Sequence, residues 1–149
     1  MEEIVIDGSN TILGRLASNV AKILLEGKRV VVINSEKIVV SGEPSKLIQF
    51  YKDTILNVKS HYSHKWRPKR ARSPTRLFKK TVAGMLPKNN KKGEDALKRL
   101  TVFVGIPNKY KNKQAIKLQE ISADKLGRKY TTLNVIAEQL GWKVSMIEQ

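Results

Sequence analysis

The pattern of hydrophobic and polar positions predicts three consecutive elements near the start of the chain. Residues 4–6 form a short β-branched run that stops at a cluster of turn formers, which is typical of a buried strand. Apolar side chains then recur at helical spacing over residues 13–24, and Gly27 is placed to end that helix. Residues 29–33 are apolar on both faces, which favours a strand covered on each side by helices.

This strand, helix, strand order predicts the fold class. Two strands joined by one helix almost always pair in parallel through a right-handed crossover. We therefore expect an α/β protein, a three-layer α/β/α sandwich around a small, mostly parallel sheet, with a basic loop and helix extension. The 149 residues fit one domain, with a basic segment at 59–92 and a loosely assigned tail at 108–149.

Further elements follow along the chain. Residues 38–40 predict another short strand, and Pro44 begins a helix that reaches about residue 56. A weaker helix is expected over 94–99, a buried strand over 101–104, and a last amphipathic helix over 133–140.

A central helix is predicted by Ser73 and Pro74, a capping serine followed by proline at the first helical position. Helical spacing divides its side chains into two groups. The expected buried face holds Phe78, Thr81, Val82 and Met85, and the expected cationic face holds Arg76, Lys79 and Lys80.

Positive charge is concentrated in the middle of the chain. Residues 54–93 contain twelve Lys or Arg and no Asp or Glu, so they supply +12 of a formal net charge of +16. The other 109 residues hold 17 basic and 13 acidic side chains, an ordinary balance. Because like charges repel one another and weaken a compact state, this concentration indicates a strongly negative partner, and a polyphosphate backbone fits best.

Thirteen residues of this region are candidates for nucleic-acid binding. The five cations of residues 65–72 can each reach a different phosphate from an extended backbone, and Trp66 can stack on a base. A solvated surface loop is the alternative, but stabilising surface networks mix charges of both signs. The candidates are Lys59, Lys65, Trp66, Arg67, Lys69, Arg70, Arg72, Arg76, Lys79, Lys80, Lys88, Lys91 and Lys92, the last three expected in a loop with Asn89, Asn90 and Gly93.

Other functional classes find little support. The chain has no cysteine, which excludes disulfides and thiolate chemistry. No apolar run approaches the roughly 18 residues that a membrane span needs, and the acidic start does not resemble a secretory signal. We therefore expect a soluble, non-exported protein with no membrane partner.

Catalysis and cofactors are also not expected. His61 and His64 have a spacing that metal ligands use, but no carboxylate or thiolate lies nearby to complete a site. The loop at 7–14 lacks both glycine-rich phosphate-binding motifs, so Asp7 is interpreted as an ordinary turn or capping acid. No nucleophile motif is present either. We expect no enzyme, no metal, no cofactor and no small-molecule substrate.

Several motifs follow one another in a characteristic order along the chain. They are Leu13-Gly14-Arg15-Leu16-Ala17-Ser18, Val30-Val31-Val32-Ile33-Asn34-Ser35-Glu36, Val40-Ser41-Gly42, Thr81-Val82-Ala83-Gly84-Met85-Leu86-Pro87-Lys88, Gly93 and Ala96-Leu97-Lys98-Arg99-Leu100. In this order and at these separations they resemble a known family, large-subunit ribosomal protein thirteen. The similarity covers about residues 4–107 and favours the archaeal version, because residues 61–66 differ from the bacterial pattern.

The resemblance implies a fold, a cellular location and binding partners. It implies an α/β sandwich with a mostly parallel sheet, located in the large subunit of the cytoplasmic ribosome. The implied partners are large-subunit ribosomal RNA and neighbouring large-subunit ribosomal proteins, and the implied role is structural support of subunit assembly without enzyme activity. Members can also repress translation of messages, so a stand-alone mRNA-binding repressor is the alternative function.

Overall fold

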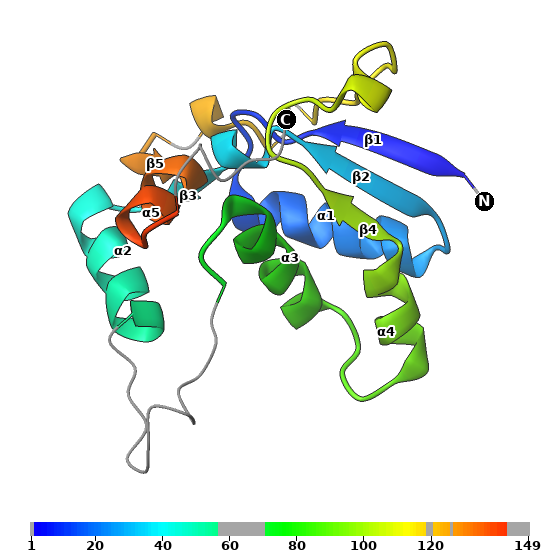
Figure 1. Ribbon diagram of the computed structural model, residues 1–149, viewed down its shortest axis with the longest axis horizontal. Helices are drawn as coiled ribbons and strands as arrows, with labels where there is room; N and C mark the ends of the chain where they lie inside the picture. The colour runs from blue at the N-terminus through cyan, green and yellow to red at the C-terminus, as the bar shows by residue number, and fades with distance from the viewer. Residues whose placement is uncertain (1, 57–70, 119–120, 126, 143–149) are drawn as a thin grey trace.

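The computed structural model describes residues 2–56, 71–118, 121–125 and 127–142 (Figure 1). Its centre is a sheet of three parallel strands, β1 (Glu3–Asp7), β2 (Arg29–Ile33) and β4 (Leu100–Val102), in the order β1-β2-β4. The parallel pairing predicted for the first two strands is confirmed, with Val5 opposite Val31. β2 is therefore the central strand, which explains why both of its faces are apolar.

Three helices lie on one side of this sheet, namely α1 (Leu13–Leu25), α3 (Pro74–Met85) and α4 (Lys91–Lys98) (Figure 1). Side chains alternate across a strand, so Val30 and Val32 face these helices and join Leu16 and Phe78 in the main core. α1 ends where predicted, because Gly27 takes the left-handed conformation with φ of 92°.

The opposite face of the sheet is covered by an irregular segment. Val31 and Ile33 pack there with Tyr110 of the 3₁₀ turn η4 (Asn108–Tyr110), and Phe103 adds a partly buried ring. The α/β sandwich is confirmed, but this outer layer is not a helix. The segment is polar and lysine-rich without helical periodicity. Its apolar cover includes the rings of Tyr110 and Phe103 and the side chain of Ala115.

A smaller antiparallel sheet joins distant parts of the chain. β3 (Val39–Ser41) pairs with β5 (Tyr130–Thr132), and α5 (Leu133–Gln139) follows β5 directly. α2 (Pro44–Tyr51) continues into the π-helical turn η2 (Lys52–Leu56) and lies beside α5 (Figure 1). Two 3₁₀ turns, η1 (Ser35–Lys37) and η6 (Ala123–Lys125), complete the described elements.

The start of α4 differs from the prediction. The helix begins at Lys91, not at residue 94, because the Asn90 side chain caps it by accepting a hydrogen bond from the Lys92 backbone N–H at 3.1 Å. Gly93 therefore lies inside the first turn. A Cβ at this position would overlap the carbonyl oxygen of Pro87, so only glycine lets the two segments approach this closely.

Two further boundaries shift. β4 covers Leu100–Val102, slightly earlier than the predicted 101–104. Met85 was expected on the buried face of the central helix, but it is 44% exposed. The helix ends at Met85, and the chain turns so that Leu86 takes the buried position in its place. Within the described residues no helix combines the length and the apolar content required to traverse a bilayer.

Candidate nucleic-acid interface

Seven of the predicted binding residues lie in the described part of the chain, and all seven side chains are exposed. We call them the α3–α4 cations: Arg72, Arg76, Lys79, Lys80, Lys88, Lys91 and Lys92. The remaining six candidates lie outside the described residues, so their role stays a prediction: Lys59, Lys65, Trp66, Arg67, Lys69 and Arg70.

α3 holds its cations in place by burying its other side. The predicted cap is confirmed, since the Ser73 hydroxyl oxygen accepts a hydrogen bond from the Arg76 backbone N–H at 3.3 Å. Leu77, Phe78 and Val82 are buried in the main core. Burial of one stripe of an amphipathic helix leaves the opposite stripe in solvent, and Arg76, Lys79 and Lys80 all lie there.

The turn after α3 and the start of α4 carry three more cations. Lys88 lies in the turn, next to Asn89 with φ of 55°. Lys91 and Lys92 were expected in a loop, which is wrong, because both belong to the first turn of α4. The partial positive charge of a helix N-terminus disfavours lysine at that place. These two lysines therefore do not stabilise their own helix.

None of the α3–α4 cations makes an ion pair within the described part of the chain. The ion pairs present there involve other lysines: Lys28 with Glu2 at 3.8 Å and Glu26 at 3.7 Å, Lys46 with Glu43 at 3.5 Å, and Lys113 with Glu3 at 3.1 Å. Exposed cations without acidic neighbours create a positive potential that attracts a polyanion. The arrangement is suited to contact phosphates.

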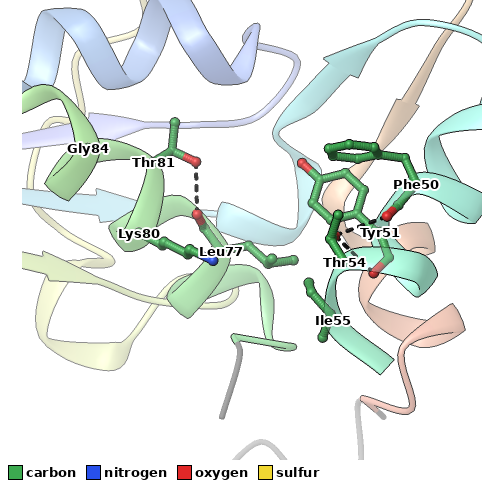
Figure 2. Close-up of a pocket in the computed structure, with 8 residues that line it drawn as sticks. All are labelled: Phe50, Tyr51, Thr54, Ile55, Leu77, Lys80, Thr81 and Gly84. Carbon is green, nitrogen blue, oxygen red and sulfur yellow. Dashed lines mark hydrogen bonds between the residues drawn. The ribbon is translucent and has the colours of Figure 1, made fainter. Parts of the chain in front are cut away.

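A groove lies next to these cations, between the α2–η2 segment and α3 (Figure 2). Its volume is about 390 Å³. It is lined by Phe50, Tyr51, Thr54, Ile55, Leu77, Lys80, Thr81 and Gly84. The sequence pattern did not predict it, because its two walls come from segments more than twenty residues apart. The one local signal is the adjacent aromatic pair at residues 50 and 51.

The loop that follows β1 has a structural role. The Asp7 carboxylate accepts hydrogen bonds from the Ser9 backbone N–H at 2.9 Å, the Ser9 hydroxyl at 2.8 Å and the Asn34 side-chain amide at 3.1 Å. Burial alone would raise the pKa of Asp7, but these hydrogen bonds and the charge of Lys117 outweigh it and hold the pKa below its usual value. The interpretation of Asp7 as a turn acid is confirmed.

Metal binding has no candidate among the residues that the structure describes, since no three acidic, histidine or cysteine side chains gather there. His61 and His64 lie outside that part of the chain.

Comparison with known proteins finds relatives that match most of this chain. Residues 1–109 match the family described as Ribosomal protein L13. The chain is 55% identical over 141 residues to large ribosomal subunit protein uL13 of Aeropyrum pernix, covering 95% of this chain and 91% of that protein. It is 40% identical over 140 residues to the protein of the same name from Saccharolobus solfataricus, covering 93% of each.

A eukaryotic relative is also similar. Large ribosomal subunit protein uL13 of Dictyostelium discoideum is 39% identical over 143 residues, which cover 94% of this chain and 76% of that protein. The pairwise matches extend well beyond residue 109, so the similarity includes most of the tail. On these grounds the chain belongs to the ribosomal protein L13 family, a family of structural ribosomal proteins and not of enzymes.

Proposed function

We propose that this chain is a structural component of the large ribosomal subunit that binds large-subunit ribosomal RNA and supports subunit assembly. Membership of the family makes it a ribosomal protein, located in the ribosome of the cytoplasm. The observation that carries the RNA-binding part is the set of α3–α4 cations, seven exposed side chains with no ion-pair partner in the described residues.

Phosphate contact explains this set better than protein stability does. Unpaired like charges repel one another in the free protein, and two of the lysines oppose the dipole of their own helix. A folded RNA supplies the missing negative charge and is recognised mainly by shape, phosphates and 2′-hydroxyls. The six cationic or aromatic candidates at 59–70 belong to the same proposed surface, within one domain that spans the chain.

The salt dependence of binding tests the proposal. Each phosphate neutralised contributes about 0.7 to 0.9 to the slope of log K against log salt, so seven contacts give a slope of about −5 to −6. Binding of the protein to a full-length large-subunit ribosomal RNA transcript can be measured by filter retention over a range of salt concentrations. A slope near zero would refute the proposed surface.

Substitution of three cations makes the test specific. Replacing Arg76, Lys79 and Lys80 together by alanine should make the slope shallower by roughly 2 to 3. The matched control replaces Lys28, Lys46 and Lys113, which removes the same charge from lysines that already have acidic partners. Equal changes in slope for both triple variants would show that net charge alone, and not the α3–α4 cations, determines affinity.

Sedimentation of native lysate tests the place of the protein in the cell. A structural component of the large subunit should travel almost entirely with large subunits at moderate salt, together with ribosomal RNA and neighbouring ribosomal proteins. A protein found mainly in the free fraction would favour the mRNA-binding repressor instead.

A further inference from the structure

The groove beside α3 is large enough to bind one small chemical group. Phe50, Tyr51, Thr54 and Ile55 form one wall, and residues 77–84 of α3 form the other (Figure 2). A volume of about 390 Å³ lies near the lower end of the range for small-molecule sites, roughly 300 to 1,000 Å³. The groove can therefore admit a single flat ring system, but not a helix of a partner protein.

One wall presents an aromatic ring to solvent. Phe50 is 61% exposed and stands edge to face with Tyr51, with the ring centroids 5.7 Å apart. Its exposed surface is thus available to a second ring, and stacking between a base and an aromatic side chain tolerates any of the four bases.

The groove also offers hydrogen-bonding groups. The Thr54 hydroxyl donates to the Phe50 carbonyl and the Thr81 hydroxyl donates to the Leu77 carbonyl, each at 3.0 Å, so both oxygens retain acceptor capacity. Burial raises the pKa of the Tyr51 hydroxyl, which keeps it protonated and able to donate. Figure 2 shows this hydroxyl directed toward the α3 wall. The edge of a nucleobase carries donors and acceptors that can pair with such groups.

The positive charge beside the groove favours one kind of occupant. Lys80 lines the groove and is one of the α3–α4 cations, on the same exposed side of α3 as Arg76 and Lys79. An apolar side chain from a partner protein would make no charge interaction with these cations. A nucleotide carries both a flat ring and a phosphate. We infer that the groove receives one unpaired nucleobase of the bound RNA, stacked on Phe50, with Lys80 at its phosphate. This inference rests on the proposed function.

Two substitutions test the groove in the full-length protein with the same ribosomal RNA transcript. Phe50→Ala should weaken binding by about 5- to 150-fold, the range expected for the loss of one stacked base. The slope of log K against log salt should stay as in the wild type, because no charge is removed. Lys80→Ala, by contrast, should make the slope shallower by about 0.7 to 0.9.

Gly84 allows the groove to be filled without harm to the fold. It lies within α3 and lines the groove, and a Cβ added there meets no atom within 4 Å. Leucine forms helix more readily than glycine, so Gly84→Leu should raise the thermal midpoint while it weakens RNA binding. A more stable protein with lower affinity is a result that loss of folding does not produce.

Matched controls distinguish the groove from the rest of the surface. Tyr130→Ala removes an exposed aromatic ring from β5, and Gly14→Leu fills an open glycine position in α1. Both should bind RNA as the wild type does. The inference is overturned if Phe50→Ala and Gly84→Leu bind RNA like the wild type, and this holds for any other occupant of the groove. It is also overturned if the two controls lose as much affinity as the groove variants.

Failure of the inference can be told from failure of the proposed function. Wild-type binding that does not depend on salt would refute the proposed function itself. A steep wild-type slope together with unchanged affinity of Phe50→Ala and Gly84→Leu would refute only the groove.

Discussion

Two sets of cationic side chains in the described part of the chain differ in their surroundings. Lys28, Lys46 and Lys113 each lie within 4 Å of a glutamate. The α3–α4 cations are all exposed, and none of this unpaired group has such a partner in the described residues. Paired surface charges are ordinary in folded proteins and contribute little to stability. The unpaired cations of α3 and α4 also belong to a stretch, residues 54–93, with no acidic residue, and this concentration of charge led to the proposed RNA surface.

The largest effect on stability is expected from truncating a buried side chain of α3, the helix that carries three of the unpaired cations. Phe78 is completely buried in the main core on the side of α3 opposite its cations. Phe78→Ala should lower the free energy of unfolding by about 3–5 kcal/mol, because it leaves a cavity. Chemical denaturation measures this loss. Met85→Ala, an exposed position on the same helix, should change stability by less than about 1 kcal/mol, and similar losses for both would contradict the assigned faces of α3.

A smaller effect is expected at the start of the same helix. Ser73→Ala removes the acceptor that caps the Arg76 N–H, which should cost about 0.5–2 kcal/mol. Ser45→Ala is the control, an exposed serine in the first turn of α2 that makes no cap. Thermal denaturation of both variants should show a clear shift for Ser73 alone, and equal shifts would argue against the cap.

The smallest effect compares the two groups of cations directly. Lys113 pairs with Glu3 and lies over the Tyr110 ring, 5.1 Å from its centroid. Lys113→Ala should therefore destabilise the free protein by roughly 0.2–1 kcal/mol. Lys79→Ala removes a charge that has no ion-pair partner in the described residues and shares its side of α3 with Arg76 and Lys80, so it should leave the stability unchanged or slightly raised at low salt. Destabilisation by Lys79→Ala similar to that by Lys113→Ala would remove the distinction between the groups.

Local sequence signals predicted most of the regular elements. The apolar run of β2, the spacing of α1 and the serine cap of α3 each lie within a few neighbouring residues, and each is confirmed. The start of α4 was misplaced because Gly93, which lies inside the first turn, has low helix propensity. Asn is a favoured capping residue, so Asn90 was a signal that the prediction did not use. The close contact between Gly93 and Pro87 is not visible in the sequence pattern.

Features that depend on distant segments were not predictable in the same way. The pairing of β3 with β5 joins residues about ninety positions apart, and the cover over the second face of the main sheet depends on Tyr110. The cationic candidates followed from charge, and the seven of them in the described residues are exposed. The groove that combines residue 50 with residue 84 was not predicted. Periodicity reports which side of an element is buried and says nothing about what two elements enclose.

The contact between Gly93 and Pro87 has a consequence for how the protein meets its partner. Because no side chain separates the two backbones, the corner joining α3 to α4 is set by the chain itself. The backbone positions of the lysines on both sides of this corner are then set by the fold of the chain. The protein has then already lost part of its conformational entropy during folding. A ligand that matches this arrangement causes less further loss when it binds, which favours tighter association.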